Sequence, residues 1–179
     1  MSYTSILLVK EFFSLHGFLA LPYEDILLVK NSNPGKGGTR SYLMEIEDVL
    51  RIEQAVVKPV AWHTLKFVPS VLKQSPEIFR FLEGDFLSLT KKVFSAEGFS
   101  RVLVIPGLPA SSELKEQSIT YLKEKGIDGV ICFPTVLAAL IKKINPRRVY
   151  LSQTNELLRI LKFYEFFKEE QPSLPFRGK

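Results

Sequence analysis

The side chains best suited to chemistry lie in two short segments, the acidic pair Glu24-Asp25 and the segment AVVKPVAWHT (55–64). Carboxylates are the hard oxygen ligands that Mg²⁺ prefers, and a bound Mg²⁺ stabilises charge on a phosphate and lowers the pKa of an attacking water. The ammonium group of Lys58, in contrast, has three donors and no lone pair for a metal. The chemistry of these segments therefore depends on whether a second carboxylate accompanies Asp25.

The strands and helices that would position these segments follow from hydrophobic pattern and turn residues. Strands are expected at 18–21, 25–30, 55–61, 101–106 and 129–133. Helices are expected at 4–15, 44–53, 76–94 and 112–125, from Pro134 or Thr135 to Pro146, and at 154–168. Asp25 then opens one strand, and Lys58 lies inside another.

The clearest unit of the chain is the stretch 101–133, which reads as strand, helix and strand. Two strands joined by one helix in this way form a parallel pair with a right-handed crossover. The sequence contains no linker long enough to divide the chain. We therefore expect an α/β fold in a single domain over residues 1–170, with a mixed sheet flanked by helices, and a mobile tail at 171–179.

Composition limits the classes of protein to consider. Hydrophobic residues make up 46% and charged residues 24% of the 179 positions, as in ordinary globular domains. Cys132 is the single cysteine, which excludes an intrachain disulfide and a cysteine cluster for zinc. No apolar run approaches the ~20 residues that span a bilayer, and the first residues lack a basic region and a cleavage site. We expect a cytoplasmic protein that does not enter a membrane.

The two segments also resemble a known family. An acidic residue that opens one strand, followed by a Val-Val strand that ends in Trp62-His63-Thr64, is similar to the pattern of the restriction-endonuclease-like superfamily, the PD-(D/E)xK nucleases. The order helix, three strands, helix, strand, helix over residues 3–145 resembles the core of that superfamily, and residues 62–83 resemble uncharacterised bacterial proteins of this group. The resemblance implies a restriction-endonuclease-like core. In active members an Asp and a Glu hold Mg²⁺, and a Lys orients the attacking water.

The motif is incomplete in this sequence. Asp25 matches the first acidic residue. If Trp62-His63-Thr64 sets the register, Lys58 stands where the Glu belongs and Val60 where the Lys belongs. If Lys58 is the motif lysine, Val56 stands in the Glu position. Neither register supplies a carboxylate, so we expect Asp25 and Lys58 to be vestigial, with no bound metal or other cofactor and no, or very weak, Mg²⁺-dependent nuclease activity.

Two further features bear on this site. Pro59 cannot donate a ladder hydrogen bond, which predicts a bulge or a locally unpaired edge in its strand. A carboxylate from another element could also restore the metal site, and Mg²⁺ would then be the cofactor. Glu24 could replace Asp25, and the candidates for the second carboxylate are Glu11, Glu45, Glu47 and Glu53.

The leading hypothesis is a catalytically degenerate nuclease-fold protein that serves as a nucleic-acid-binding or assembly module. The net charge of +5 permits phosphate contacts, and the candidate cations near the former cleft are Lys36, Arg40, Lys58, Lys66 and Lys73. One alternative is an active Mg²⁺-dependent nuclease with a migrated carboxylate. The other is a protein-interaction or homo-oligomerisation domain that uses the aromatic residues near the C-terminus, Phe163, Tyr164, Phe166 and Phe167.

Overall fold

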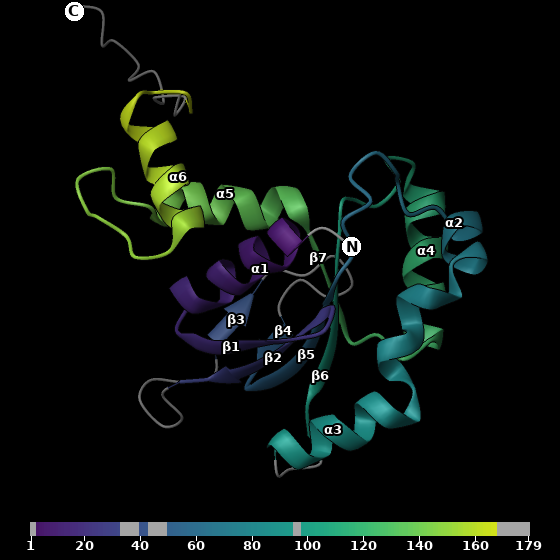
Figure 1. Cartoon of the computed structure of the whole chain (residues 1–179). Coiled ribbons are helices and arrows are strands. Elements are labelled where there is room, and N and C mark those ends of the chain that lie inside the picture. The colour runs from purple at the N-terminus through teal and green to yellow at the C-terminus, as the bar shows by residue number, and fades with distance from the viewer. Residues whose placement is uncertain (1–2, 33–39, 43–49, 95–97, 168–179) are drawn as a thin grey trace, which may run out of the picture.

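The structure is a computed structural model that describes residues 3–32, 40–42, 50–94 and 98–167 (Figure 1). Its main sheet has the strand order β1 (Phe18–Tyr23), β2 (Ile26–Asn31), β5 (Gln54–Pro59), β6 (Ser100–Ile105) and β7 (Gly129–Cys132). The pairs β1–β2 and β2–β5 are antiparallel, whereas β5–β6 and β6–β7 are parallel. A separate two-stranded sheet joins β3 (Arg40–Tyr42) to β4 (Leu50–Ile52). The predicted mixed sheet is confirmed.

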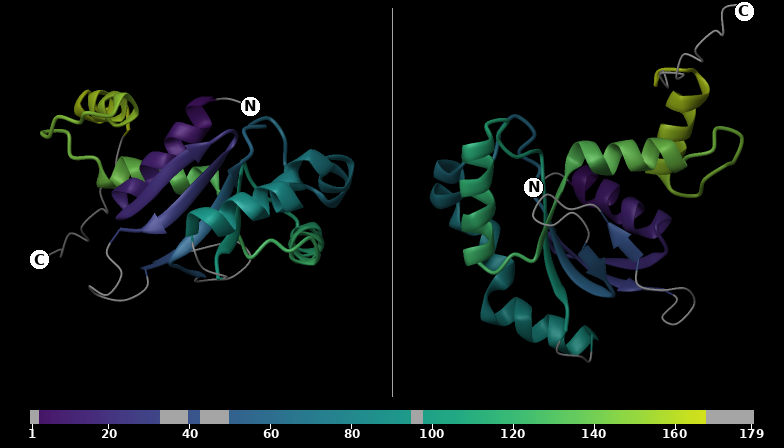
Figure 2. Two further views of the ribbon diagram at one scale, coloured as in Figure 1. Left: turned by 60° about the horizontal axis from the view of Figure 1, so that its bottom comes forward. Right: turned by 180° about the vertical axis from the view of Figure 1, so that it is seen from behind.

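Helices cover both faces of the main sheet, so the described residues form one α/β domain (Figure 2). On one face lie α1 (Tyr3–Leu15) and α5 (Phe133–Lys143), with α6 (Gln153–Phe163) packed against them. On the other face lie α2 (Pro69–Gln74), the 3₁₀ helix η1 (Pro76–Leu82), α3 (Gly84–Phe94) and α4 (Ser112–Glu124). Two hydrophobic cores result, one on each face of the sheet.

Strand β5 divides its side chains between these two cores. Ala55 and Val57 are buried in the core that contains α1, and Val56 and Val60 are buried in the core that contains η1 and α3. The division follows from the two-residue period of a strand. Lys58 has the parity of Val56 and Val60, so the strand places an ammonium group among apolar side chains on the face covered by η1.

Several elements predicted from the sequence are confirmed. The expected helix at 4–15 is α1, and β6, α4 and β7 form the expected unit with parallel strands. Gly126 follows α4 with a φ of 87°, and its N–H donates to the Lys123 carbonyl at 2.8 Å. Glycine adopts this conformation without the steric penalty of a Cβ, which explains why the helix ends there.

The helices predicted at 44–53 and 76–94 are wrong in part. Leu50–Ile52 forms strand β4, because its apolar-polar-apolar alternation suits a strand and buries Ile52 in the core. Residues 44–49 lie outside the described residues. Between 76 and 94 the chain forms η1 and then α3, which are separated by the extended backbone of Glu83 (φ −83°, ψ 163°).

Two further helix boundaries follow from local residues. α2 begins at Pro69, since proline fits the first position of a helix. α6 ends at Phe163 rather than at 168, and Glu165 turns the chain with a φ of 59°. None of the helices in the described ranges is long and apolar enough to cross a bilayer. The tail 171–179 lies outside the described residues.

Candidate functional site

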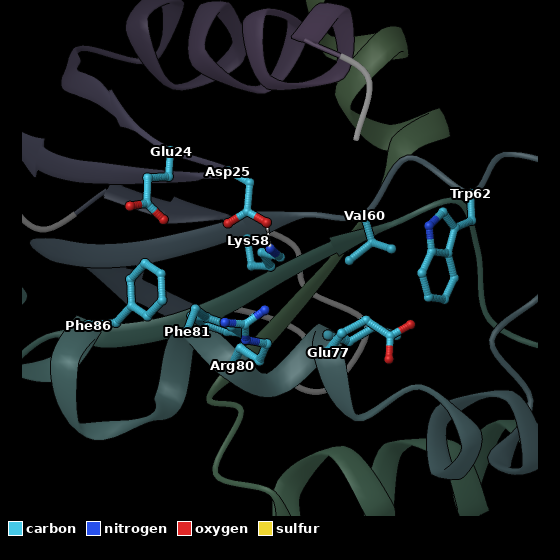
Figure 3. Close-up of a pocket in the computed structure, with 10 residues that line it drawn as sticks. Glu24, Asp25, Lys58, Val60, Trp62, Glu77, Arg80, Phe81 and Phe86 are labelled. Atoms are coloured by element: carbon cyan, nitrogen blue, oxygen red, sulfur yellow. Dashed lines mark hydrogen bonds and ion pairs between the residues drawn. The ribbon is translucent and has the colours of Figure 1, made fainter.

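A pocket of about 270 Å³ lies between the β1–β2 turn, the carboxyl end of β5, and the helices η1 and α3 (Figure 3). Charged and apolar side chains line it: Glu24, Asp25, Lys58, Val60, Trp62, Glu77, Ile78, Arg80, Phe81 and Phe86. Trp62 and Phe86 lie at opposite ends, and Asp25 and Lys58 meet between them, across from Arg80 (Figure 3). The pocket thus contains both Asp25 and Lys58, the two residues at which the sequence analysis placed the candidate site.

Lys58 reaches the pocket from within the sheet. The residue is 6% exposed, and its neighbours on the same face, Val56 and Val60, are 1% and 3% exposed. A charged group in such surroundings requires a partner, because an unpaired buried charge is strongly unfavourable. Lys58 Nζ donates to Asp25 Oδ2, and the two side chains form an ion pair.

Asp25 is held in place by a tight hairpin turn. Tyr23 pairs with Ile26, which leaves Glu24 and Asp25 as a two-residue loop. Glu24 has a φ of 50°, a left-handed conformation that costs a non-glycine residue about 1–2 kcal/mol. The Asp25 side chain is 46% exposed and that of Lys58 only 8%. The ion pair is therefore shielded from solvent on its lysine side and accessible to solvent on its carboxylate side.

Pro59 lies at the point where β5 loses one of its two neighbours. It pairs with Val104 of β6, and the Val60 N–H donates to the Val104 carbonyl at 2.8 Å. Since backbone N–H groups alternate along a strand, the nitrogen of Pro59 is directed toward β2, whose pairing with β5 ends at Leu27↔Val57. Of the two predicted outcomes the bulge is wrong and the locally unpaired edge is confirmed.

Strand β5 contributes no carboxylate to the pocket. Val56 and Lys58, the two residues that could stand in the glutamate position of the motif, lie on one face of β5, and neither can ligate a metal. The carboxylate of Asp25 already binds an ammonium group. In the part of the chain that the structure describes, no three Asp, Glu, His or Cys side chains are grouped to hold a metal ion.

Glu77 and Arg80 line the pocket, and sequence reasoning missed both. They lie three residues apart in η1, and a 3₁₀ helix has three residues per turn, so side chains at i and i+3 share one face. The residues between and after them, including Ile78 and Phe81, are buried against the sheet. The spacing of the two charges was visible in the sequence, but it indicates a shared face only once the 3₁₀ winding is known.

The residues of the segment Trp62-His63-Thr64 lie in different environments, and only Trp62 lines the pocket. Trp62 lines the pocket, and its ring stacks on Phe67 at 5.9 Å between centroids. His63 Nε2 lies 3.1 Å from Ser5 Oγ, and the His63 ring meets the ring of Phe133 edge to face. Thr64 is exposed outside the pocket lining. His63 therefore joins the loop after β5 to α1 and to the start of α5.

The other candidate carboxylates have different surroundings. Glu11 accepts a hydrogen bond from Asn155 Nδ2 at 2.6 Å, and this contact joins α1 to α6 on the face of the sheet away from the pocket. Glu53 precedes β5, whose opposite end carries the pocket. Glu45 and Glu47 lie outside the described residues. Glu24 lines the pocket next to Asp25.

The cations proposed to contact nucleic acid are not gathered in the pocket. Lys58 lines it, and Lys66 is exposed in the loop before α2. Lys73 lies 6.0 Å from the Tyr121 ring centroid, in a second hollow whose lining includes the carboxylates of Glu113, Glu116 and Glu124. For Arg40 only the backbone position in β3 is described, and Lys36 lies outside the described residues.

No protein-family model, no curated protein and no solved structure matches this chain. Its function is therefore argued from the chemistry of the pocket and of its surface.

Proposed function

We propose that this chain is a catalytically degenerate member of the restriction-endonuclease-like superfamily that binds nucleic acid without cleaving it. The observation that supports the loss of catalysis is the ion pair between Lys58 and Asp25. In the register set by Trp62-His63-Thr64, Lys58 stands where the metal-binding Glu belongs. The lysine therefore does two things at once, since it removes one carboxylate and neutralises the other.

Mg²⁺ binding at this site is physically unfavourable. The carboxylate of Asp25 would have to leave Lys58 to ligate a cation, and the ammonium would stay buried without a partner. Removing one member of a buried ion pair typically costs about 3–5 kcal/mol. The free energy of Mg²⁺ binding through one or two carboxylates does not offset this cost, because much of the coordination comes from water and substrate.

The arrangement of the sheet is the support for the family assignment. Helix α1 precedes three neighbouring strands, β1, β2 and β5, and these are followed by helices, β6, α4 and β7. This is the order that the resemblance of Asp25 and the segment 55–64 to the superfamily motif implies for its core. Asp25 precedes β2 and Lys58 lies in the adjacent β5, so the two motif positions meet at one point.

Nucleic acid is the proposed partner because cations are exposed along the segment that leads from β5 to α3. Lys66, Lys73 and Arg80 are exposed there, and the partly exposed Trp62 offers a ring for stacking. The chain has a net charge of +5 and a pI near 9.3. Phosphate contacts from such residues release counterions, so binding must weaken steeply as salt is added.

Cleavage and binding should be measured side by side on short single-stranded and double-stranded DNA and RNA, with Mg²⁺ or Mn²⁺ present. We expect a mobility shift at low salt and intact nucleic acid after incubation. Cleavage by the wild type that is lost in both Asp25→Ala and Glu77→Ala would overturn the loss of catalysis. The absence of a shift at low salt would overturn the choice of partner.

A further inference from the structure

Helix α6 is apolar on two sides, although only one of them faces the protein. Its inner side buries Asn155 and Leu158 against α1 and α5, and Lys162 Nζ donates to the Ile141 carbonyl at 3.0 Å. Its outer side carries Leu157, Ile160, Phe163 and Tyr164. These four side chains are 57%, 39%, 57% and 68% exposed.

The loop before α6 extends this apolar surface. Tyr150 N–H donates to Glu156 Oε2 at 3.2 Å, and Arg159 Nη1 donates to the Pro146 carbonyl at 3.2 Å. At 100° per residue, Glu156 lies between Ile160 and Phe163 on the helix circumference. The loop is thus held beside the outer side, where Val149 and Leu151 are 77% and 105% exposed. We call Val149, Leu151, Leu157, Ile160, Phe163 and Tyr164 the outer face.

One ion pair, between Glu156 and Arg159, lies beside the apolar residues of the outer face. Arg159 donates to both carboxylate oxygens of Glu156, at 2.6 to 2.9 Å. These hydrogen bonds lower the pKa of Glu156, with a further contribution from the Tyr150 N–H, and they raise the pKa of Arg159. A surface that meets this face need not supply a counter-charge to either residue.

We propose that the outer face is the interface of a homodimer in which α6 packs against α6 of a second copy across a two-fold axis. Leu157, Ile160 and Tyr164 follow the alternating spacing of three and four residues by which one helix packs on another. A two-fold axis joins the same patch on both copies, so the patch must complement itself, and an apolar stripe beside one ion pair does so.

The size of the outer face fits this partner. With roughly 150–200 Å² for each fully exposed large side chain, its six residues offer on the order of 700 Å² at the exposures observed. A standard interface buries about 800 Å² on each partner. This inference does not depend on the pocket and stands or falls separately from the proposed function.

The mass of the full chain in solution tests the dimer, by light scattering after size exclusion and by sedimentation equilibrium. We expect twice the 20.4 kDa of one chain. Ile160→Glu should raise the dimer dissociation constant at least about 100-fold, because both copies would bury a carboxylate in an apolar contact. Leu114→Glu on α4 is the matched control, since Leu114 is 40% exposed and Ile160 39%.

Interfaces of this area have dissociation constants in the micromolar-to-picomolar range. A wild type that stays monomeric at about 100 µM would therefore overturn the proposal. So would equal dissociation by Ile160→Glu and Leu114→Glu.

Cysteine cross-linking gives a second measurement that does not rely on a disruptive charge. Cys132, the single native cysteine, is buried. Oxidation should therefore join two chains of the Ile160→Cys variant by a disulfide between their introduced cysteines, and should leave the Leu114→Cys variant and the wild type unlinked. Equal linking of the two variants would also contradict a symmetric α6 contact.

Discussion

Lys58 and Asp25 form an ion pair whose two members differ in exposure, because the lysine side chain lies within the sheet and the carboxylate lies at the rim of the pocket. The asymmetry decides how the site responds to mutation. Loss of the carboxylate leaves a charge in an apolar surrounding, whereas loss of the lysine leaves a carboxylate that water can reach. The two halves of one contact should therefore contribute very differently to stability.

The first prediction compares the two halves directly. Asp25→Ala should lower the free energy of unfolding by about 2–3 kcal/mol, less than the roughly 3–5 kcal/mol of a fully buried pair, because Asp25 is half exposed. Lys58→Met should change it by less than about 1 kcal/mol, since methionine fills the space and the carboxylate becomes hydrated. Urea denaturation of both variants measures the difference, with Asp85→Ala as a control on an exposed carboxylate near the pocket. Equal effects of the two substitutions would contradict this account.

A second prediction concerns the lost metal site. Lys58→Glu combined with Val60→Lys completes the motif in the register set by Trp62-His63-Thr64. Mg²⁺ at about ten times its dissociation constant should then stabilise the double variant by about 1.4 kcal/mol, or roughly 3–6 °C in Tm, and should not stabilise the wild type. The control is Lys58→Gln with Val60→Lys, which removes the ammonium without supplying a carboxylate. A Mg²⁺ response in the wild type, or in both double variants, would refute the prediction.

The hairpin turn supplies a third prediction. Glu24→Gly should raise the free energy of unfolding by about 0.5–1 kcal/mol, because relief of the left-handed strain exceeds the entropy that glycine adds to the unfolded chain. Glu83→Gly is the matched control, since Glu83 is extended with a φ of −83° and gains no such relief. Thermal denaturation of the two variants should move Tm in opposite directions. A fall in Tm for Glu24→Gly would show that the turn is not strained.

The fourth prediction concerns nucleic acid. If Lys66 contacts a phosphate, Lys66→Ala should reduce the slope of log K against log salt by about 0.7–0.9 and weaken binding to all sequences alike. Lys91→Ala on α3 is a control at an exposed lysine outside the proposed segment. Fluorescence anisotropy between low and physiological salt gives both slopes. An unchanged slope in Lys66→Ala would remove that residue from the interface.

The pair of Glu156 and Arg159 leads to a prediction about pH. The hydrogen bonds from Arg159 lower the pKa of Glu156 in the folded state, so the pair stabilises the fold above the unfolded pKa of about 4.3 and this contribution is lost as pH falls through the folded value. The Tm advantage of the wild type over Glu156→Gln should be complete at pH 7 and shrink below about pH 4.3. An advantage that persists or grows under acid conditions would contradict the sign.

The sequence was sufficient for the architecture where local pattern and tertiary environment agree. The unit β6, α4 and β7 combines apolar strands with an amphipathic helix that ends at Gly126, and the structure has each element as expected. Local pattern failed at 50–52, where acidic neighbours suggested a helix but the segment pairs with β3 as a strand and Ile52 is buried in the core. Pairing between strands is not local, so the pattern of one segment could not reveal it.

The site was predicted only in outline. Asp25 and Lys58 were identified by the motif, and the missing carboxylate followed from two alternative registers. That they pair with each other, and that Glu77 and Arg80 come from η1 to line the same pocket, depends on packing across the sheet. His63 belongs to the segment Trp62-His63-Thr64 that sets the motif register, but it contacts Ser5 and Phe133, because the loop after β5 turns it toward α1 and α5.

Pro59 has a consequence for how the chain selects one strand alignment among several. If β2 slid along β5 so that their pairing ran over position 59, a carbonyl of β2 would face a nitrogen that carries no proton, and the slipped alignment would forfeit a hydrogen bond. The penalty applies in one direction only, toward the carboxyl end of β5. Proline thus disfavours a slip of β2 in that direction, and in the observed alignment Asp25, the residue before β2, forms its ion pair with Lys58.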